Sequence, residues 1–215
     1  MMEADGTGQK QLTANAGRNY GPTVTPDGHY VVFHSDRTGV WHIWRMNRDG
    51  GNPKELVEGE WASCSADSQW VIYGDLYRVS IDGGDPVRLI NKNALVGYAA
   101  ISPDGKLIAC EYKEQESAPW RVVIIPFAGG EPIKTLDIPV PHSIGPFFRW
   151  TNDNRQLIYV GSSNLWLRPL NGEQPTQLTN FKTQFIHSFV LSRDGRLAIS
   201  RGTDTNDVVL ISDLK

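Results

Sequence analysis

Five aspartates recur along the 215-residue chain at similar spacing, each two residues after a serine or threonine. They are Asp27, Asp67, Asp104, Asp153 and Asp194, and they are separated by 40, 37, 49 and 41 residues. Repeated carboxylates could bind calcium, but a calcium loop needs the spacing Asp-x-Asp-x-Asp, which these motifs lack. Aspartate can instead bond its own backbone in a turn, and a following glycine supplies the positive φ that closes a hairpin. We therefore predict structural turns and no metal site, with these turn residues: Asp27, Gly28, Asp67, Asp104, Gly105, Asp153, Asp194 and Gly195.

Other residue types that carry chemistry form no recognisable constellation in the sequence. His142 and His187 each precede a predicted strand, but zinc normally needs three or four ligands. The nucleophile pattern Gly-x-Ser-x-Gly does not occur, and we expect Glu114 and Glu116 to be solvated in a loop. The sequence thus predicts no catalytic residues, no cofactor and a protein that is not an enzyme.

Short β-rich runs surround each aspartate motif. Residues 30–33 and 107–110, for example, are unbroken apolar runs typical of strands covered on both faces. Further strands follow in each repeat, and the fourth often begins near a proline, which suits an edge strand. A four-stranded repeat of about 40 residues is typical of propeller blades. We predict one all-β propeller domain over residues 1–215, with about five four-stranded blades at 21–57, 61–90, 97–136, 146–179 and 187–215.

The two ends of the chain carry complementary parts of one four-stranded repeat. Residues 9–13 have the pattern of a fourth strand, whereas the C-terminal repeat reaches only a third strand at 208–211. We expect residues 9–13 to complete the C-terminal blade and close the ring. The alternative is a fragment of a larger propeller. Closure matters because an open edge would leave about five ladder hydrogen bonds unmade, each contributing roughly 0.5–1.5 kcal/mol, and would invite aggregation.

Composition restricts the classes of partner. The net charge is −3 and the pI is about 5.9, with both signs of charge interspersed along the chain. A nucleic-acid-binding domain would normally show a basic stripe, so we predict no nucleic-acid partner. The two cysteines suggest no disulfide framework, and no leader or membrane-spanning pattern is recognisable. We expect a monomer whose propeller domain makes no membrane contact.

The repeat motifs resemble the WD40-like β-propeller repeats of the TolB type. The resemblance rests on residues 102–105 (Ser-Pro-Asp-Gly), 49–51 and 82–84 (Asp-Gly-Gly), and 12–13 and 178–179 (Leu-Thr). The C-terminal third is particularly similar to the propellers of bacterial serine/threonine kinases and winged-helix regulators. This resemblance implies a sensor or docking part of a larger bacterial signalling protein, and it favours a location outside the cytoplasm, in the periplasm.

One face of the predicted propeller carries its more variable loops. These loops join second to third strands and connect each blade to the next, and loops on a rigid scaffold often carry function. Aromatic and arginine side chains there favour protein contact. We predict that this face binds another protein, or another domain of the parent chain, through Tyr20, Arg37, Trp41, Trp61, Tyr98, Lys113, His142, His187 and Arg201. The alternatives are an accessory propeller of a hydrolase or peptidase, and a site for a small molecule or metal at the channel mouth.

Overall fold

The computed structural model confirms the predicted all-β propeller. It describes residues 1–3, 5–14, 16–91, 93–140, 147–192 and 194–203, and this part of the chain contains four four-stranded antiparallel sheets and one two-stranded sheet. Each sheet uses strands in chain order. The described residues contain no helix, and therefore none with the length and apolarity to cross a membrane.

Five successive sheets form the blades. The first is β1 (Asn19–Val24), β2 (Tyr30–Ser35), β3 (His42–Asn47) and β4 (Lys54–Glu58). The second is β5 (Ser63–Cys64), β6 (Trp70–Tyr73), β7 (Tyr77–Ser80) and β8 (Val87–Arg88). The third is β9 (Leu95–Ile101), β10 (Leu107–Lys113), β11 (Arg121–Pro126) and β12 (Lys134–Leu136). The fourth is β13 (Phe148–Trp150), β14 (Gln156–Gly161), β15 (Asn164–Pro169) and β16 (Thr176–Gln177). The fifth has β17 (Phe185–Leu191) and β18 (Leu197–Gly202).

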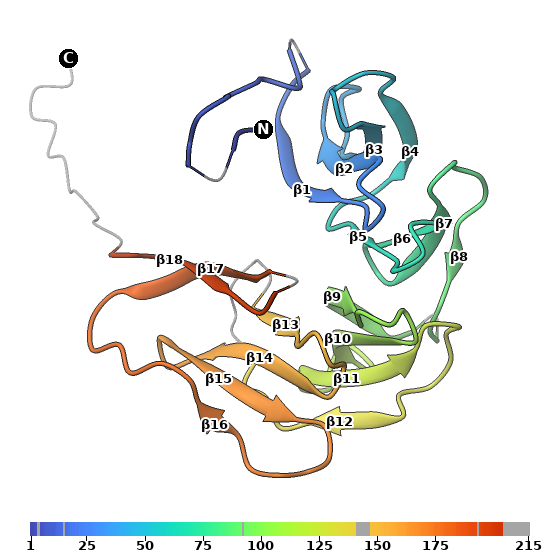
Figure 1. The fold of residues 1–215 in the computed structure, drawn as a ribbon. Coiled ribbons are helices and arrows are strands. Elements are labelled where there is room, and N and C mark those ends of the chain that lie inside the picture. Colours follow the sequence, from blue (N-terminus) through green and yellow to red (C-terminus); the bar gives the residue numbers. More distant parts are fainter. Residues whose placement is uncertain (4, 15, 92, 141–146, 193, 204–215) are drawn as a thin grey trace, which may run out of the picture.

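The blades are arranged around a common centre. The first strands β1, β5, β9, β13 and β17 are innermost, and the later strands of each blade extend outward (Figure 1). Consecutive innermost strands contact one another from β1 through β13. Because the strands of each blade are antiparallel, the connections β2–β3 and β4–β5 lie on the same face of the propeller, together with their counterparts in the other blades.

Each aspartate motif forms the same hydrogen-bonded turn between a first and a second strand. The Oδ1 atom of each aspartate accepts a hydrogen bond from the Ser or Thr hydroxyl two residues earlier, at 2.5–2.6 Å. This bond is the largest cause that lowers the pKa of four of these carboxyl groups, those of Asp27, Asp104, Asp153 and Asp194. Gly28, Gly105 and Gly195 follow with φ of 75°, 74° and 84°.

Two turns have a side chain at the position where the other three have glycine. Ser68 and Asn154 adopt φ of 60° and 63°. The Ser68 hydroxyl accepts a hydrogen bond from the Asp27 N–H at 3.1 Å, and Asn154 Oδ1 accepts one from the Asp104 N–H at 2.8 Å. Both bonds join neighbouring blades. The departure from glycine in the second blade therefore leaves the turn intact and adds a link between blades.

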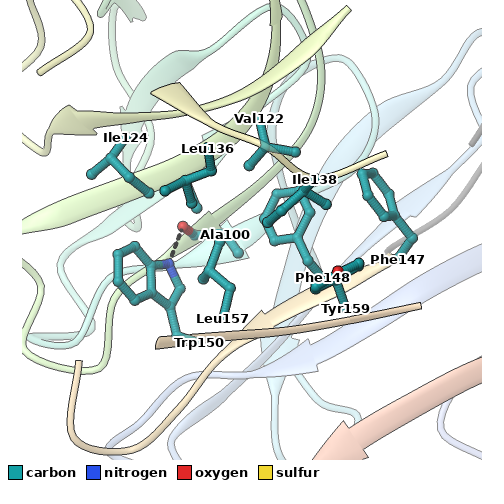
Figure 2. Close-up of a cluster of buried hydrophobic side chains, with 11 residues drawn as sticks. Ala100, Val122, Ile124, Leu136, Ile138, Phe147, Phe148, Trp150, Leu157 and Tyr159 are labelled. Carbon is teal, nitrogen blue, oxygen red and sulfur yellow. Dashed lines mark hydrogen bonds between the residues drawn. The ribbon is translucent and has the colours of Figure 1, made fainter. Parts of the chain in front are cut away.

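The cores lie between adjacent blades. Figure 2 shows the largest cluster, in which side chains of the third blade meet those of the fourth. Ala100, Val122 and Leu136 pack there against Phe148 and Leu157. The Trp150 indole N–H in this cluster donates to the Ala100 carbonyl at 2.9 Å, which joins two innermost strands. Similar clusters fill the spaces between the first and second blades and between the second and third.

The N-terminal segment lies against the first blade and forms no strand over residues 9–13. Leu12 packs on the cluster of Val31, Phe33 and Met46. A Cβ atom on Gly50 would lie 2.9 Å from the Leu12 carbonyl, just as one on Gly129 would lie 2.6 Å from the Leu89 carbonyl. Leu12 thus occupies the position beside the first blade that Leu89, which follows β8, occupies beside the third.

The predicted ring closure pairs residues 9–13 with residues 208–211. Its third-strand partner, residues 208–211, lies outside the described residues, so the pairing with residues 9–13 stays a prediction. In the described part of the chain, the fifth blade comprises β17 and β18 alone. Among the described residues, no blade packs on one face of the first blade or of the fifth, and Val24 and Val190 are 53% and 54% exposed.

Candidate binding surface at the channel mouth

A cavity opens at the centre of the propeller. Its volume is about 490 Å³, and it is lined by innermost strands of all five blades. The lining includes Thr23, Ser63, Tyr98, Trp150 and Leu191. Cavities that bind small ligands have comparable volumes. The lining extends from Trp61 on the loop face predicted to bind a partner to Pro103 and Asn152 in the aspartate turns of the opposite face.

An aromatic cluster surrounds His34 on this face. Trp41, Trp61 and Tyr20 have ring centroids 5.3, 5.5 and 6.0 Å from the imidazole. They come from separate segments: β1, the β2–β3 connection and the β4–β5 connection. His34 is only 3% exposed, whereas Tyr20 and Trp61 are 54% and 42% exposed. A buried imidazole therefore supports a surface of exposed aromatic rings.

The electrostatics of this cluster favour a neutral imidazole. Burial lowers the pKa of His34, and the charge of nearby Glu60 opposes that effect only in part. Arg18 also contacts the cluster, with its guanidinium 5.1 Å from the Trp41 ring centroid. Its Nε atom also donates to Asp36 Oδ2 at 2.7 Å. The Trp41 ring thus already contacts one guanidinium, whose charge is balanced by Asp36.

β-bulges shape the inner edge of this face in three blades. The register shifts between Tyr20 and Thr23 in β1, in the β9–β10 pair and between Ile186 and Ser188 in β17. A glycine in each region lies against a titratable side chain: Gly21 against His34, Gly97 against Glu111 and Gly202 against His187. Bulges of this kind redirect side chains, and the absent Cβ leaves room for each polar group.

A second polar group lies along the channel. Arg149 donates from Nη1 to the Tyr98 hydroxyl and, at 3.0 Å, to the Phe148 carbonyl. Burial raises the pKa of Tyr98, and the Arg149 charge opposes this shift. Burial also raises the pKa of Glu111 to about 7, against a hydrogen bond from the Tyr98 N–H that lowers it. These residues place a cation and a readily protonated carboxyl group near the channel.

The nine predicted contact residues divide into several environments. Tyr20, Trp41 and Trp61 come together in the aromatic cluster, and Tyr98 lines the channel cavity. Lys113 is half-buried with its Nζ atom 5.8 Å from the Trp120 ring centroid. His187 is exposed in β17, and His142 lies outside the described residues.

The two predicted arginines each lie against an aromatic ring. The Arg37 guanidinium lies 4.6 Å from the Trp44 ring centroid and donates to Ser35 Oγ, while Arg201 lies 3.5 Å from the Phe181 ring centroid. Both side chains are half-buried, and their contact with a partner stays a prediction. Arg149 had no predicted role, because it lies in a short strand without a recognisable motif. No role was predicted for His34 or Glu111 either. The signal for His34 and Glu111 was their equivalent position, seven residues after the turn aspartate in two repeats.

The described residues contain no group of three or more His, Cys, Asp or Glu side chains arranged to hold a metal ion. Cys64 and Cys110 are free thiols, and burial raises the pKa of each to about 12. Neither thiol is therefore a reactive thiolate near neutral pH.

Comparisons with known proteins agree with this geometry. No family model matches the chain. TolB from Acinetobacter baumannii superposes with a TM-score of 0.62 at 19% identity, covering 95% of this chain and 48% of that one. A putative TolB from Agrobacterium tumefaciens gives 0.61 at 16% identity, covering 78% and 67%. The fold is that of a TolB-like propeller. A curated relative, the uncharacterized protein Atu1656 from Agrobacterium fabrum, is 31% identical over 93 residues, which are 43% of this chain and 28% of the relative.

This TolB-like chain spans about half the length of the Acinetobacter protein and 28% of Atu1656. The finer resemblance to propellers of kinases and winged-helix regulators stays a prediction.

The prediction that the chain is not an enzyme is wrong as an inference from this fold. Oligogalacturonate lyase from Vibrio parahaemolyticus superposes with a TM-score of 0.56 at 14% identity, covering 86% of this chain and 71% of that one. A puromycin hydrolase mutant gives 0.56 at 16% identity, covering 89% and 34%. Propellers of this kind thus occur in proteins named as enzymes, and an absent sequence motif does not set this chain apart from them.

Proposed function

We propose that the channel-mouth surface of this TolB-like propeller binds another protein, or another domain of the same polypeptide. The observation that carries the proposal is the aromatic cluster around buried His34, in which Tyr20 and Trp61 are exposed and Trp41 is half-buried. Large aromatic side chains bury much area at low entropic cost, and they are enriched where proteins bind one another.

The propeller scaffold adds a second argument. The segments that carry these rings belong to two blades, and packed clusters between blades fix their relative positions. A surface that is already ordered loses less conformational entropy when a partner binds. Trp61 lines the channel cavity as well as the outer surface, so a bound segment could reach from the loops into the channel.

Paired substitutions test this proposal. Tyr20→Ala with Trp61→Ala removes two exposed rings, while Ile133→Ala with Leu178→Ala removes two exposed apolar side chains from outer segments, 61% and 42% exposed. The immobilised chain is used to capture proteins from an extract of cells that encode it, and the captured protein is purified for affinity measurements. We expect at least tenfold weaker binding for the first pair and unchanged binding for the second. Equal losses, or no reproducible captured protein, would overturn the proposal.

The resemblance to TolB-type proteins adds three further proposals. They are a location outside the cytoplasm, a place in a larger signalling protein and a monomeric state of this domain.

The channel cavity of about 490 Å³ supports a second candidate function, the binding of a small anionic molecule beside Arg149. Arg149→Gln would abolish ligand-induced thermal stabilisation in that case, whereas the outer pair Ile133→Ala with Leu178→Ala, which lies outside the cavity lining, would leave it unchanged.

A further inference from the structure

A second hollow lies on the outer side of the aromatic cluster. It is an open groove of about 490 Å³ formed by the end of the β2–β3 connection and the segment after β4. Its lining comprises Gly39, Val40, Trp41, Glu58, Gly59, Glu60 and Trp61. We call it the Trp41–Trp61 groove. Two tryptophans and two glutamates thus line one hollow.

The carboxylates of this groove are uncompensated. Glu58 and Glu60 form no ion pair among the described residues, while nearby Arg18 pairs with Asp36 at 2.7 Å. An aromatic face attracts a cation through its quadrupole, and a neighbouring carboxylate strengthens that attraction. Arg18 lies 5.1 Å from the Trp41 ring centroid, which shows that this indole accepts a guanidinium.

The backbone of the groove is unusual at Trp61. This residue adopts φ of 62° although it is bulky, a conformation that L side chains other than Asn and Asp rarely adopt. It is also 42% exposed, so burial does little to offset the strain. Gly59 fixes the preceding backbone, because a Cβ atom there would lie 2.6 Å from the Tyr73 ring. Strained residues of this kind cluster at functional sites.

We propose that the Trp41–Trp61 groove binds a basic side chain, arginine or lysine, presented by the partner protein. This inference rests on the proposed function and adds the chemistry that the surface recognises. Charge complementarity selects this occupant: an acidic or neutral side chain would leave Glu58 and Glu60 unpaired next to it, whereas a guanidinium can stack on an indole and donate to a carboxylate at once.

A peptide pair tests the charge requirement. The probes are acetyl-Gly-Arg-Gly-Arg-Gly-amide and the same peptide with citrulline at both arginine positions, which keeps the shape and removes the charge. Binding to the full chain labelled with 5-fluorotryptophan is followed by fluorine NMR in 150 mM salt, with resonances assigned from Trp41→Phe and Trp61→Phe. We expect saturable shifts of the Trp41 and Trp61 resonances, with the citrulline peptide at least tenfold weaker. Equal binding of the two peptides would overturn the proposal.

Two variants separate recognition from folding. Glu58→Gln with Glu60→Gln should weaken the arginine peptide at least fivefold, while Glu131→Gln with Glu173→Gln makes the same charge change on the opposite loops and should have no effect. Trp61→Gly removes the indole and relieves the positive φ, so binding should be lost while Tm stays equal or rises. A fall in Tm for Trp61→Gly, or equal effects of the two glutamate pairs, would contradict the assignment.

The outcomes distinguish this inference from the proposed function. If a captured partner requires Tyr20 and Trp61 but the peptides bind equally, the basic-side-chain inference fails and the protein-binding function stands. If the arginine peptide binds selectively but no partner is captured reproducibly, the groove assignment stands and the proposed function fails.

Discussion

Single residues at the aspartate turns do more than close hairpins. Ser68 and Asn154 replace glycine at φ of 60° and 63°, and each side chain bonds the turn of the neighbouring blade. A non-glycine residue in this conformation costs about 1 kcal/mol, which is similar to the contribution of one hydrogen bond, roughly 0.5–1.5 kcal/mol. The two effects nearly cancel in stability, so the side chain serves mainly to fix one blade relative to the next.

The first prediction follows from this balance. Ser68→Ala keeps the strain and loses the bond to the Asp27 N–H, so the free energy of unfolding should fall by about 1–2 kcal/mol. Ser68→Gly loses the same bond but relieves the backbone, so its loss should be about 0.5 kcal/mol or less. Urea denaturation measures both. Gly105→Ala is the control for backbone strain, because it introduces a side chain at a positive φ and places its Cβ atom 3.2 Å from the Ala66 Cβ atom. Identical losses for the two Ser68 variants would show that φ strain is unimportant there.

Glu111 gives a pH-dependent prediction. Burial raises the pKa of this carboxyl to about 7 in the folded chain, compared with about 4.3 in an unfolded one. The folded state therefore binds the proton more tightly, and its stability falls as pH rises from about 4.5 to about 7. Glu111→Gln is neutral throughout, so its Tm should exceed that of the wild type by a few degrees at pH 8 and match it at pH 4.5.

Glu114→Gln is the matched control for this pH dependence. Glu114 is exposed in the loop after β10, and its removal should leave the pH dependence of Tm unchanged. A Tm gain for Glu111→Gln that is the same at both pH values would contradict the titration of this carboxyl group.

Among the elements, the short innermost strands hold the blades together. β13 has three residues, and its Trp150 donates to the Ala100 carbonyl of β9 within the cluster of Figure 2.

At the periphery of the propeller, lysine side chains form a second kind of link between repeats. Lys10 donates to the Asp49 carbonyl and Lys54 to the Asp82 carbonyl, at 2.8 and 2.5 Å, so the fourth-strand position of one repeat is tied to a turn of the next.

The third prediction concerns the contact between β9 and β13. Trp150→Phe removes an indole N–H from a buried site and leaves the Ala100 carbonyl without its indole donor, so the free energy of unfolding should fall by about 2–3 kcal/mol. Trp166→Phe is the control: its indole donates to the Gly161 carbonyl of the same blade, and the residue is half-buried. We expect about 1 kcal/mol for Trp166→Phe in urea denaturation. A larger loss for Trp166→Phe would mean that contacts within a blade dominate.

The sequence predicted those elements whose signals are local. Turn chemistry around Asp27 or Asp104 depends on four adjacent residues, and the strands that follow are continuous apolar runs, so both could be located without tertiary information. The set of contact residues at the channel mouth stays a prediction. The structure brings Tyr20, Trp41 and Trp61 together around His34. β-bulges shift the register beside Gly21 and Gly97 and thereby place His34 and Glu111 against the innermost strands, which no local sequence pattern indicates. Aromatic packing of Arg37 likewise depends on β3, which alternation alone does not reveal.

On the scale of the whole molecule, the blades form a series in which each packs on its neighbours. Stability in such arrays is approximately a sum of repeat and interface contributions. The interface between the third and fourth blades has a large buried cluster. On the outer face of the first blade, the described residues form a smaller cluster, in which Leu12 and Trp44 pack on Val31, Phe33 and Met46. A hollow of about 680 Å³ remains beside this face. The two ends of the series should therefore be its least stable parts.

Equivalent leucines at the end and in the middle of the series test this view. Leu89 is 4% exposed between the second and third blades, whereas Leu12 is half-buried in the corresponding position beside the first. Leu89→Ala should lower the free energy of unfolding by about 2–5 kcal/mol. Leu12→Ala should lower it by about 1 kcal/mol, since solvent already reaches that side chain. Urea denaturation provides the comparison. If closure by residues 208–211 buried the face of the first blade, Leu12 would be enclosed like Leu89, so equal losses would contradict the open arrangement and favour the closed ring.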